Sequence, residues 1–297
     1  MSERKNKMVL GTVELGLDYG INNDCGKPSN QQAFDLLDAA WNNGITELDT
    51  AAAYGDSEKI IGEYQKETGH YFLIDTKLPV SIKPAQYDSC LETSLERLHV
   101  PSLHTLYLHS FKQCLDKSIL DFLNEQKKIG KIKQIGISIY EPDEMSHILD
   151  HLPFVDTIQF PYNVLDHHRW TENGLLKRAK DNGKKMYVRS VFLQGLVFKS
   201  PSDAFVKTIN AGKYLETLGR LAGKNGLSIA ELAFQYVWVS PDVDKIIIGC
   251  QGKDDVIRNV AMIDSSKPID GNVRTELEKT TTGISNQVID PRNWKKQ

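Results

Sequence analysis

Residues 45–55 read Ile45-Thr46-Glu47-Leu48-Asp49-Thr50-Ala51-Ala52-Ala53-Tyr54-Gly55, a short apolar run that ends in a carboxylate and is followed by a phenol. Two runs of the same kind come next, Phe72-Leu73-Ile74-Asp75-Thr76-Lys77 and Thr105-Leu106-Tyr107-Leu108-His109, and each ends in a basic side chain. Short runs rich in Val, Ile and Leu are typical of parallel strands buried on both faces. The pattern predicts consecutive strands whose C-terminal ends bring together Asp49, Tyr54, Lys77 and His109.

Strand-like runs alternate with helix-like runs along the chain. Strands are predicted at Met8–Val13, Ile45–Asp49, Tyr71–Lys77, Leu103–His109, Ile132–Ser138, Val155–Phe160, Lys185–Arg189 and Lys245–Ile248. Helices are predicted at Ser29–Asn43, Ser57–Gln65, Pro84–Leu98, Cys114–Ile129, Pro142–Leu149, Gly174–Asn182, Phe205–Asn225 and Lys253–Met262. This alternation predicts an α/β fold, a closed (β/α)8 TIM barrel with its functional groups at the C-terminal face.

An open doubly wound sheet is the competing architecture. Its dinucleotide-binding form carries Gly-x-Gly-x-x-Gly after the first strand, and the sequence lacks that motif there. Barrels of this length form one domain. We therefore expect a single domain over residues 1–297, with residues 284–297 as a C-terminal tail on the surface and residues 200–208 as a loop over the barrel mouth.

The composition excludes several functional classes. The 297 residues are 40% hydrophobic and 25% charged, with a net charge of −3, which gives neither a basic field for nucleic acid nor a polybasic membrane signal. The polar start predicts no signal peptide, and no apolar stretch is long enough to span a membrane. The four cysteines, Cys25, Cys90, Cys114 and Cys250, are scattered, which is typical of reduced thiols. We expect a cytoplasmic protein without a disulfide framework.

The four polar groups at the strand ends form a proton-transfer device. A tyrosine, with a pKa of about 10, is a poor proton donor at neutral pH unless a neighbouring ammonium lowers that pKa. Lys77 would supply this charge, and Asp49 would keep Lys77 protonated. His109 would donate a hydrogen bond to a substrate carbonyl. None of these side chains is a hydride source, so the chemistry calls for a cofactor.

Two other interpretations stay open. The first is a binding or sensor protein on the same barrel, with slow turnover. The second uses Lys77 as the Schiff-base nucleophile of an aldolase-like barrel, which requires a neutral amine and is opposed by Asp49. A metal site is not expected, because no Cys or paired-carboxylate motif completes the histidine pairs His147/His151 and His167-His168.

At these positions the chain resembles the aldo-keto reductases, over nearly its whole length. The segments that carry the resemblance are Leu48–Gly55 with Ser57-Glu58 and Ile61-Gly62, Thr76-Lys77, Leu108-His109-Ser110, and Lys133–Ser138 with its Ile-Gly-x-Ser pattern. The resemblance implies reversible reduction of a carbonyl with NADPH or NADH, bound extended at the barrel mouth. It also implies that Tyr54 is the general acid, tuned by Lys77 and Asp49, and that His109 orients the carbonyl.

The resemblance further implies the rest of the site. The expected cofactor contacts are Gly11, Thr12, Asp49, Ser138, Gln159, Arg189, Ser190, Phe192, Gln194, Gly195, Gly249, Gln251, Asp255 and Asn259. The loops that follow the first and sixth predicted strands, residues 14–20 and 161–163, should border the substrate. The expected substrate contacts are therefore Tyr19, Tyr54, His109 and Tyr162, with packing under the rim as the alternative for Tyr19 and for Tyr162. The loop around residues 16–29 resembles a bacterial branch linked to sugar and surface-polysaccharide metabolism, so a sugar or sugar derivative is the expected substrate. The sequence leaves the oligomeric state open.

Three positions depart from the family pattern. Ile139 stands where many members have Asn. Arg189 replaces an aromatic residue that stacks on the nicotinamide; its guanidinium can also stack, or it can hold an anionic substrate. Asp255 stands where members that prefer NADPH commonly carry a basic residue or Gln, and a carboxylate there repels a 2′-phosphate and accepts from a 2′-hydroxyl. With Lys253 and Arg258 close by, we expect a weakened preference for NADPH.

Overall fold

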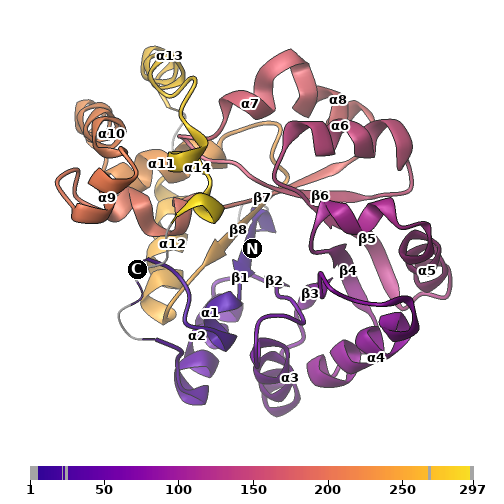
Figure 1. Ribbon diagram of the computed structural model, residues 1–297. Coiled ribbons are helices and arrows are strands. Elements are labelled where there is room, and N and C mark those ends of the chain that lie inside the picture. Colours follow the sequence, from indigo (N-terminus) through magenta and orange to yellow (C-terminus); the bar gives the residue numbers. More distant parts are fainter. Residues whose placement is uncertain (1–5, 22, 24–25, 267–268, 295–297) are drawn as a thin grey trace.

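The computed structural model describes residues 6–294 except 22, 24–25 and 267–268. Its centre is a closed barrel of parallel strands that follow one another in chain order (Figure 1). The strands are β1 (Met8–Gly11), β2 (Glu47–Asp49), β3 (Leu73–Leu78), β4 (Leu103–Leu108), β5 (Ile132–Ser138), β6 (Thr157–Pro161), β7 (Lys185–Arg189) and β8 (Lys245–Gly249). The predicted single-domain (β/α)8 barrel is confirmed.

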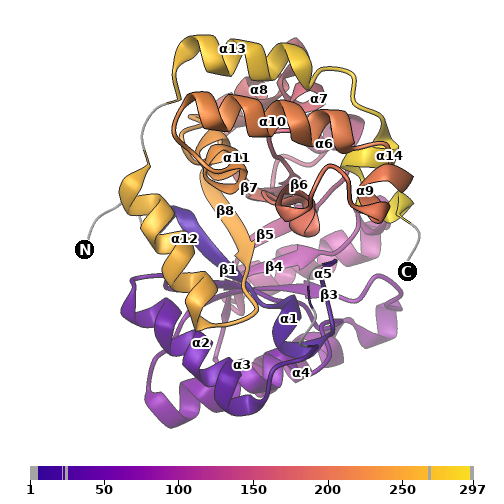
Figure 2. The same cartoon turned by 90° about the vertical axis from the view of Figure 1, so that its left-hand side faces the viewer.

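Helices surround the barrel. The α-helices are α1 (Val13–Gly16), α2 (Asn30–Asn42), α3 (Ser57–Thr68), α4 (Tyr87–Leu98), α5 (Lys117–Lys128), α6 (Pro142–His151), α7 (His168–Thr171), α8 (Leu175–Asp181), α9 (Ala204–Thr208), α10 (Gly212–Lys224), α11 (Ile229–Trp238), α12 (Lys253–Ser265), α13 (Gly271–Thr280) and α14 (Asn286–Ile289). Short 3-10 turns lie at Pro84–Gln86, Phe111–Leu115, Glu172–Gly174, Leu193–Phe198 and Pro291–Asn293. Figure 2 shows α10 lying beside both α11 and α13 on one flank of the barrel.

The strand register brings the strand ends to one level. Gly11, the last residue of β1, pairs with Asp49 on one side and with Gly249 on the other. At the far side of the barrel, Ser138 pairs with Gln159 in the same way. Because all the strands run parallel, their C-terminal residues form one ring at one mouth of the barrel.

Local sequence explains the elements that frame this mouth. Ser29 caps α2 in a capping box: its side chain accepts from the Gln32 N–H, and the Gln32 side chain accepts from the Ser29 N–H, which satisfies two orphan donors of the first turn. Inside the barrel, Val9, Tyr187 and Ile247 form a buried apolar cluster. The barrel centre is therefore packed, and the open space lies at its mouth.

Two of the predicted elements need correction, and some helices were not predicted. The predicted strand Met8–Val13 ends at Gly11, and Val13 begins the short helix α1. The predicted helix Phe205–Asn225 is two helices, because the chain between α9 and α10 takes a left-handed turn at Asn210, with φ 58°. Helix α11 was not predicted. Its residues from Leu232 to Trp238 are all buried, so it lacks the polar face that marks an amphipathic helix in sequence.

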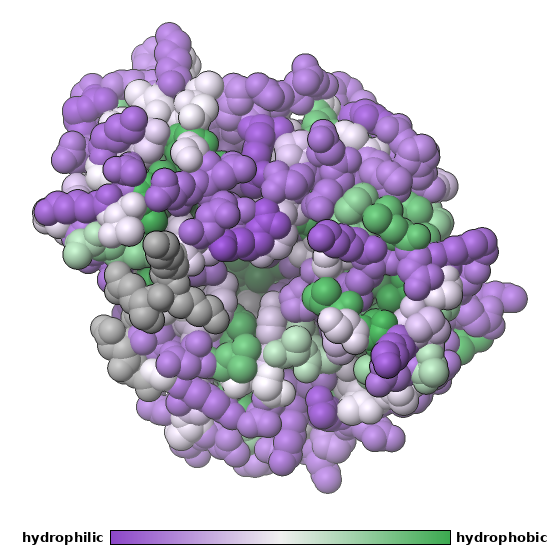
Figure 3. All heavy atoms as spheres, viewed as in Figure 1, coloured by the Kyte–Doolittle hydropathy of each residue, from purple (hydrophilic) through white to green (hydrophobic). Residues whose placement is uncertain are grey.

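The C-terminal segment packs against the body of the protein. Val288 and Ile289 of α14 are buried, and the ring of Trp294 lies 5.1 Å from that of Phe205. Cys90, Cys114 and Cys250 are free thiols, whereas Cys25 lies outside the described residues. Within the described ranges, no helix combines the length and the apolar character that crossing a membrane requires. Hydrophilic side chains dominate the face seen in Figure 3, around a hollow near its centre.

Candidate active site

A cavity of about 1280 Å³ opens at the C-terminal ends of the strands. Every strand contributes to the lining of this cavity a residue at or near its C-terminal end. These residues are Gly11, Asp49, Lys77, His109, Ser138, Gln159, Arg189 and Gly249. The predicted mouth of the barrel is therefore a real cavity, built by the whole sheet.

Nearly all of the predicted site residues line this cavity. Asp49, Tyr54, Lys77 and His109 lie there together, as do Tyr19 and all fourteen positions expected to contact the cofactor. Tyr162 does not line it: this side chain is 1% exposed and stacks on Tyr236 of α11, with ring centroids 6.3 Å apart. Tyr162 packs beneath the rim and is removed from the candidate substrate contacts.

A buried ion pair forms the floor of the site. Lys77 Nζ donates to Asp49 Oδ2 at 2.6 Å and to the Thr50 carbonyl at 2.7 Å. The second oxygen of Asp49 accepts from Gln159 Nε2 at 2.7 Å. Burial lowers the pKa of Lys77, and the carboxylate of Asp49 opposes this change. Both oxygens of Asp49 are thus engaged, and the Gln159 amide keeps its carbonyl oxygen for another partner.

Tyr54 and His109 lie above this pair. The ring of Tyr54 is edge-on to that of His109 with centroids 5.9 Å apart, and Lys77 Nζ lies 5.1 Å from the centre of the Tyr54 ring. Burial lowers the pKa of His109 to about 4, and the charges of Lys77 and Arg189 add to this effect. The imidazole is therefore neutral at physiological pH, and it can donate one hydrogen bond.

The expected lowering of the Tyr54 pKa is not found in the protein alone. Burial raises the pKa of Tyr54 well above its ordinary value, and the charge of Asp49 raises it further. The sequence prediction assumed that the Lys77 ammonium would dominate the pKa of Tyr54, but Asp49 lies 2.6 Å from Lys77 and neutralises its charge. The phenol is consequently a firmly protonated group at neutral pH.

Close backbone packing fixes the position of Tyr54. A Cβ atom on Gly16 of α1 would come within 1.7 Å of the Tyr54 carbonyl oxygen, and one on Gly55 would come within 2.4 Å of the Gly16 oxygen. Gly55 has φ +55°, a conformation in which side chains are strained. Ser57 Oγ donates to the Thr12 carbonyl at 2.9 Å across the same junction. Helix α1 and the loop after β2 therefore form one rigid corner.

The loop after β7 is strained where it borders the cavity. Ser190, Leu193 and Gln194 have positive φ angles of 64°, 46° and 52°, and each such residue costs on the order of 1–3 kcal/mol. Gln194 Nε2 donates to the Tyr19 hydroxyl at 2.8 Å. Strain of this kind is concentrated at functional sites, and here it joins the loops after β1 and β7 across the cavity mouth.

At the far end of the cavity, the basic residues are already paired. Asp255 accepts from the Gln251 N–H at 2.8 Å and forms an ion pair with Arg258. Lys253 lies 4.0 Å from Asp35. A 2′-phosphate at this end would have to compete with carboxylates for both cations.

Sequence reasoning missed several lining residues. Glu14 lies in α1 with Oε2 buried and without a hydrogen-bond partner among the described residues, and burial raises its pKa to about 7. Tyr140 follows β5, and Lys199 follows the 3-10 turn Leu193–Phe198. Asp203 comes from residues 200–208, predicted as a loop over the mouth, of which Ala204–Thr208 form helix α9. Their positions depend on loop conformations, for which the sequence carries no periodic signal.

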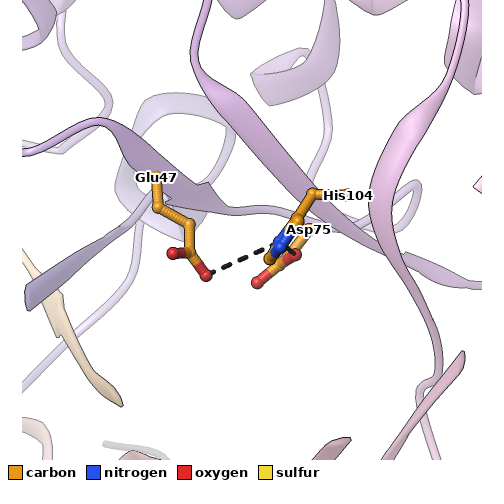
Figure 4. Close-up of side chains that lie close together, drawn as sticks. All are labelled: Glu47, Asp75 and His104. Carbon is orange, nitrogen blue, oxygen red and sulfur yellow. Dashed lines mark hydrogen bonds and ion pairs between the residues drawn. The ribbon is translucent and has the colours of Figure 1, made fainter. Parts of the chain in front are cut away.

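A second polar cluster lies within the strands beneath the site. Figure 4 shows Glu47, Asp75 and His104 directed toward one another, with potential ligand atoms within 4.8 Å of each other. His104 Nδ1 lies 2.9 Å from Asp75, while Glu47 accepts from the Tyr187 hydroxyl at 2.8 Å and pairs with Lys245 at 2.5 Å. Each of these three residues already has a hydrogen-bonding or ionic partner, so the cluster is a buried charge network; the absence of a metal site stays a prediction.

The cavity fits an extended dinucleotide. Its lining includes Tyr54 and His109 at the catalytic end, Gly249, and Asn259 and Met262 of α12. One cavity therefore connects the catalytic end with helix α12. A Cβ on Gly249 would come within 2.3 Å of the Glu14 carboxylate, so a side chain at this position would force Glu14 to move. Ser138 and Gln159 line the catalytic end of this cavity and Asn259 lines its other end, which are the positions where the family resemblance implies contacts with the carboxamide and the adenine.

Comparison with known proteins identifies the family of this chain. The model of the aldo/keto reductase family matches residues 7–274. The NADH-specific methylglyoxal reductase of Escherichia coli K12 is 26% identical over 301 aligned residues, which cover 87% of this chain and 90% of the relative. Aldo-keto reductase YhdN of Bacillus subtilis is 24% identical over 310 residues, covering 93% and 91%.

Solved structures share the fold. The holo form of aldo-keto reductase AKR11C1 from Bacillus halodurans has a TM-score of 0.75 at 20% identity, with 97% of this chain and 95% of that chain covered. An aldo-keto reductase from Klebsiella pneumoniae in complex with NADPH has a TM-score of 0.69 at 20% identity, with coverage of 93% and 90%. The family model spans most of the sequence, and the chain therefore belongs to the aldo-keto reductase family, the NAD(P)H-dependent oxidoreductases that reduce carbonyl groups.

Proposed function

We propose that this enzyme reduces the aldehyde or ketone of a small polar substrate, such as a sugar or sugar derivative, with Tyr54 as the proton donor. The observation that carries the proposal is the grouping of Tyr54, His109 and the Lys77–Asp49 pair at one end of the cavity. The bound nicotinamide supplies the hydride. The polar lining around Tyr19, Ser190 and Gln194 favours a hydroxylated substrate over an apolar one.

Each residue has a distinct part in this reaction. Neutral His109 donates a hydrogen bond to the carbonyl oxygen and orients it. As negative charge develops on that oxygen, the protonated phenol of Tyr54 transfers its proton. The Lys77 ammonium lies 5.1 Å from the centre of the Tyr54 ring and offsets the charge of Asp49, so the phenolate that remains does not face an unpaired carboxylate. A tyrosine with a raised pKa holds its proton until charge develops on the oxygen, which suits reduction.

Replacement of Tyr54 by Phe tests this assignment. Tyr54→Phe should lower kcat by at least roughly 100-fold, the usual contribution of a positioned acid, while the affinity for the reduced cofactor stays nearly unchanged. Turnover is followed by the absorbance of the reduced nicotinamide with simple aldehydes, and cofactor affinity by tryptophan fluorescence. Near-wild-type turnover in the Phe variant would show that another group donates the proton.

We also propose that the preference for NADPH is weak and that NADH is accepted. The support is the pairing of Asp255 with Arg258 and of Lys253 with Asp35, which leaves little free positive charge for a 2′-phosphate. A fluorescence titration with each cofactor measures the two dissociation constants. Binding of NADPH more than roughly 100-fold tighter than NADH, about 2.7 kcal/mol, would refute this proposal. Asp255→Gln should shift the ratio toward NADPH.

A further inference from the structure

A smaller cavity of about 240 Å³ adjoins the main one at the catalytic end. The two share Tyr19, Tyr140, Arg189, Ser190 and Gln194 in their linings. The smaller cavity is closed by the C-terminal segment from Ile289 to Arg292 and by Arg169. A substrate whose carbonyl lies at Tyr54 and His109 therefore has room for a further group only a short distance away, beside three arginines.

Two of these arginines form ion pairs with carboxylates. Arg169 donates to both oxygens of Asp166, at 2.7 and 2.8 Å, and to Glu141 at 2.7 Å. Arg292 is held by Asp290 at 2.6 Å and by Glu141 at 2.8 Å. Their positive charges are cancelled by neighbouring carboxylates, so they shape the wall of the pocket and attract an anion only weakly.

Arg189 differs from both. Its guanidinium stacks on the ring of Tyr140 at 4.2 Å, and one N–H donates to the Ile139 carbonyl at 3.2 Å. Over the described ranges of the chain, no carboxylate forms an ion pair with it. A guanidinium carries five N–H donors, so most of those of Arg189 are available to a ligand. The stacking on Tyr140 holds the plane of the guanidinium in place, which reduces the entropy lost on binding.

The charge of Arg189 reaches the reacting groups. It acts on the ionisation of both Tyr54 and His109. At this end of the cavity the charges of Lys77 and Asp49 cancel, which leaves Arg189 as the net charge. Of the other carboxylates that line the cavity, Asp255 of α12 pairs with Arg258. Glu14 lies against Gly249 and acts on the ionisation of Tyr54 in the opposite sense to Arg189. Asp203 and Glu231 line the cavity as well. Arg189 is thus a cation next to the reacting groups that has no carboxylate partner of its own within the described part of the chain.

We propose that Arg189 binds a carboxylate or phosphate group of the substrate, so that the enzyme acts on small anionic carbonyl compounds such as oxo acids or phosphorylated sugars. The inference rests on the proposed function and narrows its substrate class. The planar, fixed fork of a guanidinium matches both anions in a bidentate manner. A role for Arg189 only in stacking on the nicotinamide is the competing interpretation, and the two predict different substrate dependence.

Matched pairs of aldehydes test the proposal. Butanal and 4-oxobutanoate differ by a carboxylate, and glyceraldehyde and its 3-phosphate differ by a phosphate. The wild type should prefer the anion in at least one pair. This preference is the ratio of kcat/KM for the anionic substrate to kcat/KM for its neutral partner. Arg189→Gln should lower this ratio roughly 10- to 100-fold, the contribution of charge-assisted hydrogen bonds. Arg189→Lys should keep part of the ratio. The pair with the larger Arg189-dependent change identifies the anion as carboxylate or phosphate.

The controls separate this role from others. Arg178→Gln removes an arginine of α8 that pairs with Asp150 on the surface, and it should leave the ratios unchanged. Circular dichroism shows whether each variant is folded, and Arg189→Lys remains informative if Arg189→Gln is not. Equal ratios in the wild type and in Arg189→Gln would overturn the proposal, even if both rates fell, because an equal loss indicates a contact with the cofactor.

A binding measurement separates failure of this inference from failure of the proposed function. Succinate and glycerol 3-phosphate carry no reducible carbonyl, and calorimetry in the presence of the reduced cofactor measures their affinity. Saturable binding that weakens roughly tenfold or more in Arg189→Gln supports the anion site even if no aldehyde is reduced. No binding of either anion to the wild type overturns the inference, while turnover of butanal would leave the reductase function intact.

Discussion

Removing one member of the Lys77–Asp49 ion pair should cost more stability than removing both. The two side chains are 1% and 6% exposed, with Nζ and Oδ2 2.6 Å apart. Lys77→Met leaves the Asp49 carboxylate buried with Gln159 as its remaining donor among the described residues, and Asp49→Asn leaves a buried ammonium bonded to the Thr50 carbonyl. Breaking a buried pair in this way costs about 3–5 kcal/mol.

The double variant leaves no buried charge behind. A methionine fills the space of the lysine stem, and the amide oxygen of the introduced asparagine still accepts from Gln159. Replacing both members of a buried pair with groups of similar volume is often close to neutral. We therefore expect the double variant to lose less stability than either single variant, with a coupling free energy of about 3 kcal/mol or more.

Urea unfolding followed by tryptophan fluorescence measures these values. A shift in the unfolding midpoint reports a change in stability only if the slope of the unfolding free energy against urea concentration stays the same. We expect the same slope for the wild type and the three variants. Losses that simply add in the double variant would refute the reasoning, since they would mean that neither group is uncompensated when its partner is removed. Turnover should be lower in all three variants than in the wild type, including the double variant that keeps most of the stability. This result would show that the ion pair is needed for the reaction more than for folding.

Two further predictions concern the first helix, α1. Gly16→Ala should lower kcat by at least roughly tenfold, because the new Cβ would displace the backbone at Tyr54; steady-state rates and a thermal melt measure this, and unchanged rates would exclude Gly16 as a support for Tyr54. Glu14 lies in the cavity with a pKa raised by burial to about 7. The carboxyl is neutral below that pH and charged above it, so affinity for the anionic dinucleotide should fall as the pH rises through about 7. Fluorescence titrations on either side of that pH should show this slope in the wild type and its absence in Glu14→Gln, and an unaltered slope in the variant would assign it to another group.

The sequence predicted the residues at strand ends well, and the reason is geometric. In a parallel barrel, the end of each strand lies at the mouth whatever the loops do. Asp49, Lys77 and His109 end consecutive strands, so their meeting follows from the strand boundaries alone. The prediction survived errors of a few residues in those boundaries, such as the end of β1 at Gly11 in place of Val13.

Tyr162 shows where this reasoning stops. It follows β6 directly, as a mouth residue should, yet it packs against Tyr236. Tyr236 belongs to α11, a helix so fully buried that its sequence shows no amphipathic pattern. Without that helix in view, the sequence could not decide between a place at the open mouth and packing under the rim for Tyr162.

The direction of the Tyr54 pKa shift illustrates a second limit. Residue types alone suggest that an ammonium next to a phenol lowers its pKa, but the net effect depends on which charges are neutralised. In the structure Asp49 cancels Lys77, whereas Arg189, first considered as a substitute for an aromatic ring, has no ion pair within the described residues. The uncompensated charge at the catalytic end therefore belongs to Arg189. A positive charge there stabilises an oxyanion that forms on the carbonyl, and it does so most for substrates that bring their own anion to it.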